Sequence, residues 1–377
     1  MVSRNAPDIL KTLSRWAYVP SAILFFLPLT CLAGAELGMS VGSTNDQIII
    51  VQDPQATRNL LPRADRIQAM VNRAIIELKG LSDATQAWQT IADSNDVVAI
   101  KVFSSPGPNT GTRISVVEAV AKGLIDSGVP ATNIIVWDRS VVDLRRAGYG
   151  ALSRQLGIRL AGALESGYDE SNYYSFALIT GLRYGDLEFG KSGEGVGRNS
   201  YVTKLLGDKV TKIISIAPAS NKLSTGVTGH LYSMTLSSVD NAWRFESNPS
   251  TLSWAMPEIY AMRSIGDRVV LCITDALICQ YEGEDTTLLH YSAVANELYV
   301  GTDPVALDLL ALRLLEKERD LSSSAQVKPD MNMYRNAALL QLGVDDLERV
   351  SIKRIVLNGR DTNSQPADAT LSPTNQP

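Results

Sequence analysis

Three aspartates follow stretches that are typical of buried strands. Asp138 follows "NIIVW", Asp275 follows "VLCIT", and Asp303 comes just after "LYVG". Because the carboxyl ends of neighbouring parallel strands meet at one edge of a sheet, we expect these carboxylates to converge there. Converging carboxylates could bind a divalent metal ion, or Asp138 and Asp275 could form a catalytic acid/base pair. Asp303 also precedes Pro304, a pair typical of a helix start, so helix capping is its alternative role. A turn or cap role is likewise the alternative for Asp138 and Asp275.

Basic side chains on the same part of the chain are candidates for contacts with an anionic ligand. Lys101 lies within the apolar stretch "VVAIKVF". A buried lysine is costly unless it faces a carboxylate or reaches the sheet edge. The loop that follows, 104–113, offers backbone N–H groups and Arg113, which together predict an anion contact. Arg244, in "VDNAWR", is a further ligand-binding candidate.

The two histidines of the chain, His230 and His290, lie too far apart in sequence for a histidine-rich metal site. His230 follows the loop "STGVTG", in which glycine lets a ligand approach the backbone closely. Thr228 and Gly229 of this loop are therefore predicted ligand contacts. His230 is a candidate catalytic residue, with an ordinary, partly exposed histidine as the alternative.

The octapeptide "GDLEFGKS" at 185–192 matches the pattern of a nucleotide phosphate loop. Such a loop requires a helix that begins at its lysine. Here "GEGVG" follows instead, and each glycine inside a helix costs about 1 kcal/mol relative to alanine. The segment is predicted to be a glycine-rich surface loop and not a nucleotide site.

Alternating strands and helices must position the candidate residues. Strand-like runs occupy 47–52, 97–103, 133–138, 209–217, 268–274, 297–301 and 351–357. Apolar residues at helical spacing predict helices over 63–79, 304–317 and 333–342, and another that begins at a capping box of Ser115 and Glu118. We expect 160–200 and 318–332 to be irregular. This alternation predicts a three-layer α/β fold with a mostly parallel sheet, in one large domain or in two lobes.

The first 35 residues have the pattern of a secretory signal. Arg4, Lys11 and Arg15 precede an apolar run that ends in the small residues Ala-Gly-Ala at 33–35. We expect cleavage there and export to the periplasm or the extracellular space. The alternative is a retained membrane anchor at 17–35, in which case the protein would contact the membrane.

Composition limits the classes of partner. The 377 residues are 45% hydrophobic and 20% charged, and the net charge of −5 offers no electrostatic footprint for nucleic acid. Cys272 and Cys279 lack the C-x-x-C spacing of an iron–sulfur cluster, so none is expected. A disulfide between them is one alternative. We expect a mature domain over 36–360 and a disordered polar tail over 361–377.

Several stretches resemble one family in their order and spacing. They are "VVAIKVFSSPGPNTGTRISVVEAVAKGL", "IIVWDRS", "STGVTGHLYSMTLSSVDNAWRF", "ITDALICQYEG" and "ELYVGTDPVALDLLALRLLE". The family is the domain of unknown function numbered 362, and the resemblance covers most of residues 45–357. It implies an α/β fold, and many members carry export signals. Lys101, Asp138, Asp275 and Asp303 fit the family pattern, which adds Asp240 and Asn241 as candidate ligand contacts.

The chain also departs from the family pattern. Where the family often has Lys-x-His before "GVTG", this chain has Ser220, Asn221 and Lys222, and Tyr232-Ser233 replaces Lys-Asn after it. The ferredoxin cysteines of some members are absent. The sequence thus predicts an exported α/β protein with a small-molecule or divalent-metal site at the strand ends. The alternative is a non-catalytic extracytoplasmic binding or scaffold protein.

Overall fold

The computed structural model describes residues 47–207, 209–325 and 328–357, which all belong to one compact unit. The predicted signal (1–35) and tail (361–377) lie outside the described residues. Within these ranges, no helix combines the length and apolarity that crossing a membrane requires. Cys272 and Cys279 are both buried and free, so the possible disulfide does not form.

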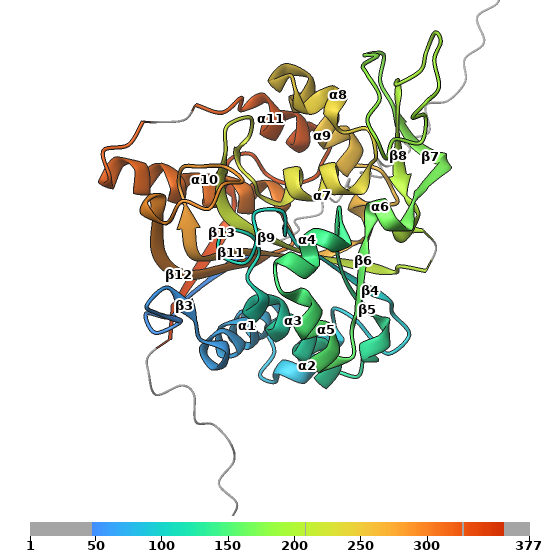
Figure 1. Ribbon diagram of the computed structural model, residues 1–377. Coiled ribbons are helices and arrows are strands. Elements are labelled where there is room, and N and C mark those ends of the chain that lie inside the picture. The colour runs from blue at the N-terminus through green and yellow to red at the C-terminus, as the bar shows by residue number, and fades with distance from the viewer. Residues whose placement is uncertain (1–46, 208, 326–327, 358–377) are drawn as a thin grey trace, which may run out of the picture. The chain divides into compact units, whose positions relative to one another are not determined.

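The centre of the fold is a nine-stranded sheet (Figure 1). Its strands are β1 (Gln47–Gln52), β4 (Val98–Lys101), β5 (Ile134–Asp138), β6 (Arg159–Gly162), β9 (Lys212–Lys222), β10 (Gly226–Val227), β11 (Val269–Gln280), β12 (Ser292–Gly301) and β13 (Ser351–Val356). The order is β13-β1-β12-β11-β9-β4-β5-β6, with β10 paired to β9. Neighbours run parallel except where β12 or β10 takes part. A separate pair, β2 (Thr57–Arg58) and β3 (Leu61–Pro62), follows β1.

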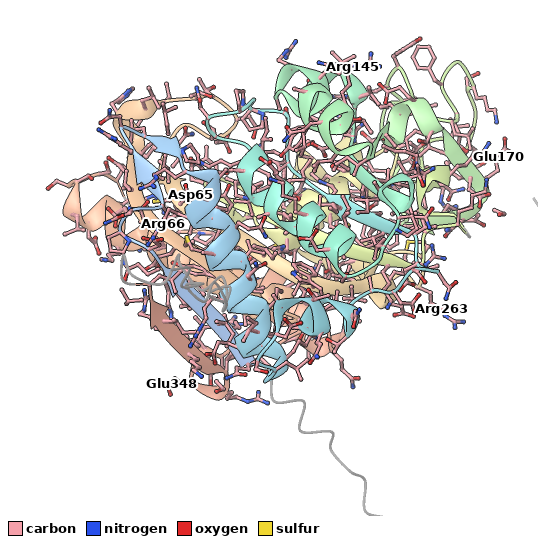
Figure 2. All side chains as sticks on the ribbon, turned by 90° about the horizontal axis from the view of Figure 1, so that it is seen from below. Asp65, Arg66, Arg145, Glu170, Arg263 and Glu348 are labelled. Carbon is pink, nitrogen blue, oxygen red and sulfur yellow. The ribbon has the colours of Figure 1, made fainter. Side chains whose placement is uncertain are left out.

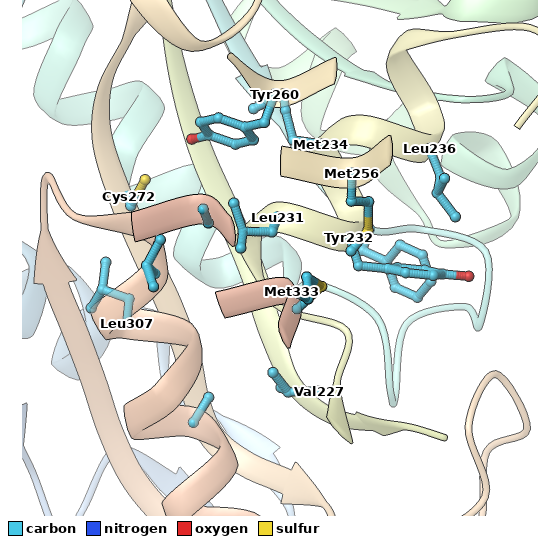
Figure 3. Close-up of a cluster of buried hydrophobic side chains, with 14 of the residues drawn as sticks. Val227, Leu231, Tyr232, Met234, Leu236, Met256, Tyr260, Cys272, Leu307 and Met333 are labelled. Atoms are coloured by element: carbon cyan, nitrogen blue, oxygen red, sulfur yellow. The ribbon is translucent and has the colours of Figure 1, made fainter. Parts of the chain in front are cut away.

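Helices cover both faces of the sheet, which confirms the predicted three-layer α/β fold (Figure 1). One apolar core lies under α1 (Ala64–Lys79), α2 (Ala84–Gln89), α3 (Ile114–Asp126) and α5 (Tyr149–Leu156). The other lies under α7 (His230–Ser238), α9 (Pro249–Tyr260), α10 (Pro304–Leu321) and α11 (Asn332–Leu339). Figure 3 shows Leu231 and Met234 of α7 and Tyr260 of α9 in this second core. The short helices are α4 (Val141–Arg146), α6 (Ala163–Ser166) and α8 (Trp243–Glu246).

Three parts of the chain described in this paragraph differ from the sequence-based expectation. The region 160–200, expected to be irregular, contains a hairpin of β7 (Tyr168–Ser175) and β8 (Asn199–Thr203). The helix α7 was not predicted because all nine of its residues are buried, so its sequence has no polar face to mark a helical period. The predicted capping box is also wrong. The helix α3 begins after Arg113, and the buried Ser115 hydroxyl has no hydrogen-bond partner among the described residues.

The octapeptide 185–192 lies in the connection between β7 and β8, which we call the 176–198 segment. This segment contains turns and no helix, as predicted. Gly185, Gly190 and Gly193 have φ angles of 96°, 82° and 138°, in the region that favours glycine. No helix dipole is therefore directed at a phosphate here.

A buried carboxylate from α10 fixes the start of α7. Asp308 accepts hydrogen bonds from the backbone N–H groups of His230 (2.6 Å) and Leu231 (3.0 Å). Gly229, at φ 48°, is needed at this contact because a Cβ there would lie 2.4 Å from the Asp308 carboxylate. Burial raises the pKa of Asp308 to about 7, even though the two N–H groups favour the charged form.

We predict that Asp308→Asn changes the pH dependence of stability. Because the pKa of Asp308 is higher in the folded than in the unfolded protein, its contribution is complete below about pH 4 and is lost as the pH rises to about 7. The free energy of unfolding of the natural protein should therefore fall, relative to that of the variant, by on the order of 4 kcal/mol over this interval. Urea unfolding of both proteins at the two pH values measures this difference, and parallel pH profiles would contradict it.

Candidate functional site

Lys101 and Asp138 form a buried ion pair where β4 and β5 end. Lys101 is fully buried, and its Nζ lies 3.0 Å from Asp138 Oδ1. The ammonium group also donates to the Val102 carbonyl (2.6 Å) and to Ser233 Oγ on α7 (3.3 Å). The lysine thus faces a carboxylate, which is one of the two arrangements expected of a buried lysine.

Asp138 is surrounded by hydrogen-bond donors. Besides Lys101 it accepts from the Ser104 backbone N–H and hydroxyl, each at 2.7 Å, and from Ser237 Oγ at 2.8 Å. Burial opposes ionisation of Asp138, but the Lys101 charge and these hydrogen bonds outweigh it and lower its pKa. Burial also lowers the pKa of Lys101, an effect that Asp138 counteracts. The pair joins two strands to α7 and leaves little of either side chain accessible.

His230 occupies the first position of α7 and is completely buried, so the expected partial exposure is wrong. Its Nδ1 lies 2.8 Å from Ser215 Oγ, and its Nε2 lies 3.1 Å from Thr274 Oγ1. Burial and the nearby Lys101 charge lower its pKa to about 3, so the imidazole is neutral at physiological pH. Both ring nitrogens are engaged with hydroxyl groups. The geometry therefore does not support the predicted catalytic role.

Arg113 and Asp275 are partners of each other. Asp275 accepts from the Arg113 backbone N–H (2.9 Å) and from its guanidinium NH1 (3.0 Å), and both side chains are buried. The guanidinium also donates to the carbonyls of Ile278 (2.7 Å) and Asn109 (3.2 Å). This arrangement fixes the start of α3. It corrects the prediction of an anion contact at Arg113 and leaves Asp275 without a position for catalysis.

Asp303 does not converge with the other two aspartates. It follows β12, which runs antiparallel to β11, and the pairing of Cys272 with Gly301 places it toward the amino end of β11. Asp303 caps α10 through the Ala306 N–H (2.8 Å) and accepts from the Val344 N–H (2.7 Å). In the described ranges no three His, Cys, Asp or Glu side chains gather as a metal site would require. The predicted Asp138–Asp275–Asp303 metal site is therefore wrong, and capping is the role of Asp303.

The remaining predicted ligand contacts are internal. Thr228 is buried, and its hydroxyl accepts from Ser220 Oγ at 3.1 Å, while Gly229 packs against Asp308. Arg244 is buried and donates to Ser200 Oγ and to three carbonyls at the base of the 176–198 segment, those of Tyr174, Phe176 and Leu178. Asn241 is buried as well, and its backbone carbonyl accepts from Ser200 Oγ, whereas its side-chain amide has no hydrogen-bond partner among the described residues. These four residues build the fold around a site but do not line one.

A pocket of about 230 Å³ lies at the carboxyl ends of β4 and β5, beside α7. We call it the α7 pocket. Its lining residues are Phe103, Ser105, Asp138, Arg139, Asp143, Arg183, Asp186, Tyr232, Leu236, Ser237, Asp240, Ala242, Trp243, Glu246 and Asp285. Of the residues predicted from the sequence, Asp138 and Asp240 belong to it. A larger groove of about 520 Å³ lies beside β12 and α10, away from these strand ends.

Two buried carboxylates define the electrostatics of the α7 pocket. Asp240 accepts backbone N–H groups of Leu187 (2.8 Å) and Tyr201 (2.7 Å), and Asp186 accepts that of Arg183 (2.6 Å). Burial raises the pKa of both carboxyls, and the proximity of Asp186 adds to the shift at Asp240. Neither forms an ion pair within the described residues.

Sequence reasoning missed most of the pocket lining. Arg183 and Asp186 come from the 176–198 segment, and Tyr232 comes from the fully buried α7, so neither part gave a periodic signal. Trp243 adjoins the candidate residues of "VDNAWR" and could have been identified from that position. The available signal was the position of this aromatic residue beside several polar candidates, which is typical of a ligand site.

We predict that Lys101→Met destabilises the protein by about 3–5 kcal/mol, because it leaves the buried Asp138 without its cation. The double variant Lys101→Met/Asp138→Asn should recover part of this loss, since it contains no unpaired charge. Chemical unfolding of Lys101→Met, of Asp138→Asn and of the double variant measures the coupling between the two residues. Additive losses in the double variant would contradict the ion-pair interpretation.

Comparison with known proteins does not indicate a function for this chain. The sequence matches no protein-family model and no curated protein. A crystal structure of a Thermotoga maritima protein from a structural genomics programme is similar to this chain at 13% identity, with a TM-score of 0.39. The match covers 70% of this chain and 59% of that protein. Similarity at this level carries no argument about what this chain binds or does.

Proposed function

We propose that this protein binds a small molecule in the α7 pocket, at the carboxyl ends of β4 and β5. One observation carries this proposal: the pocket of about 230 Å³ joins polar side chains and three aromatic walls, Phe103, Tyr232 and Trp243. Small-molecule sites typically combine apolar walls with a few fixed polar groups in this way. The carboxyl edge of a parallel sheet is also the usual place for such a site.

Binding is better supported than acid/base catalysis. Lys101, His230 and Asp275 are fully buried and do not line the α7 pocket. Asp138 does line it, but the Lys101 charge and the hydrogen bonds that Asp138 accepts outweigh its burial and lower its pKa, which makes it a weak proton acceptor. We therefore infer that the buried polar network positions the pocket walls and does not react with the ligand.

The pocket can be tested by filling it. Ser105 is exposed at the pocket mouth, so Ser105→Trp should block the pocket without disturbing the core. Ser82, exposed between α1 and α2, offers Ser82→Trp as the matched control on the other side of the sheet. In a ligand-observed NMR screen of small molecules of mixed charge, we expect hits that bind the natural protein and the control but not Ser105→Trp. Compounds that still bind Ser105→Trp would show that the binding site lies outside the α7 pocket.

A non-catalytic scaffold protein is the second candidate. The 176–198 segment exposes apolar and aromatic side chains, with Tyr184 at 91%, Phe189 at 54% and Ile179 at 51% exposure. Exposed apolar side chains gathered on one segment are typical of a protein–protein contact. A screen without any hit would favour this function over ligand binding.

Export and membership of family 362 complete the proposal, and both rest on the sequence. The signal pattern ends at Ala35, so cleavage would leave Glu36 as the first residue. We expect mass spectrometry of the protein recovered after export to show an amino terminus at Glu36. A chain that keeps residues 17–35 and stays with the membrane fraction would favour the anchor instead.

A further inference from the structure

We infer that the ligand of the α7 pocket is a small organic cation, an amine or a guanidinium compound with an apolar body. This inference rests on the proposed function, because it concerns the ligand of the same pocket. Two independent observations support it, the charge of the lining and the contacts that its aromatic rings already make.

The first observation is the balance of charge. The pocket is lined by six carboxylates, those of Asp138, Asp143, Asp186, Asp240, Glu246 and Asp285, and by two guanidinium groups, those of Arg139 and Arg183. Three of the carboxylates have their own partner outside the lining, namely Lys101 for Asp138, Arg146 for Asp143 and Lys222 for Asp285. When all these cations are counted, the lining still has a carboxylate in excess.

Asp186, Asp240 and Glu246 line the pocket and form no ion pair within the described residues. Asp186 and Asp240 are 8% and 3% exposed, and burial of charge is costly unless an opposite charge compensates it. Glu246, on α8, accepts the Tyr232 hydroxyl at 2.5 Å and also forms no ion pair within the described ranges. A cation in the pocket would supply the missing charge. An anion would instead add to the repulsion from Asp186, which raises the pKa of Asp240 beyond the larger effect of burial.

The second observation is that the aromatic walls already hold cations of the chain itself. The Arg183 guanidinium lies 3.4 Å from the centre of the Trp243 ring, and Lys222 Nζ lies 5.2 Å from that of Tyr232. The face of an aromatic ring attracts a cation through its quadrupole. The contact with Arg183 therefore shows that the Trp243 ring can bind a cation on its face. A bare metal ion fits less well, because the described carboxylates do not gather as metal ligands.

The inference can be tested with three compounds of similar shape, the cation benzylamine, the neutral benzyl alcohol and the anion benzoate. We expect benzylamine to bind the purified protein most tightly in calorimetric titrations, and its affinity to fall as salt is added. Asp186→Asn and Glu246→Gln should each weaken benzylamine by about tenfold, the usual effect of removing a hydrogen bond to a charged group. Glu170→Gln is the matched control, because Glu170 is exposed on β7 outside the pocket (Figure 2).

The outcomes separate this inference from the proposed function. Tighter binding of benzoate or benzyl alcohol, blocked by Ser105→Trp, would overturn the cation inference and leave small-molecule binding intact. Equal benzylamine affinity in Asp186→Asn, Glu246→Gln and Glu170→Gln would also overturn it. If none of the three compounds binds, the cation inference fails, and the mixed-charge screen then decides whether the pocket binds any small molecule.

Discussion

The buried ion pair of Lys101 and Asp138 is the interaction on which the rest of this region depends. Removing two charges from water costs several kcal/mol each, and mutual attraction offsets this only when further hydrogen bonds complete the geometry. Ser104, Ser233 and Ser237 provide those bonds. Since they come from the loop after β4 and from α7, the pair joins the ends of two strands to the helix that borders the α7 pocket. The pocket wall that α7 forms is thereby held in place by a buried ion pair, which is costly to break.

The same principle accounts for the other polar residues at the strand ends. A carboxylate inside a protein must find donors, and helix starts supply them as unpaired N–H groups. Asp275, Asp303 and Asp308 each accept such groups, at the starts of α3, α10 and α7 respectively. Asp275 and Asp303, which the sequence offered as candidate site residues, thus orient helices around the sheet, as Asp308 does. The candidate binding surface lies beside this framework and includes carboxylates that form no ion pair within the described residues.

The sequence by itself determined most of the framework. The strand-like runs, the helices α1, α3 and α10, and the three-layer fold follow from local patterns, because apolar residues recur with the period of each element. The role of Asp303 as a cap was also accessible, since an aspartate before a proline has a local meaning. The pairing of Lys101 with a carboxylate followed from the cost of burying an amine, although the identity of the partner did not.

Only the tertiary structure decided which polar residues meet. The antiparallel direction of β12 places Asp303 away from Asp138 and Asp275, and the strands alone do not encode that direction. His230 lost its predicted role because α7 is buried on every side, a property set by packing against α9 and α10 and not by its own residues. The α7 pocket combines residues from β5, α7, α8, the loop after β4 and the 176–198 segment. Contacts between segments so far apart in sequence leave no periodic pattern in any one of them, so the pocket could be found only in the folded chain.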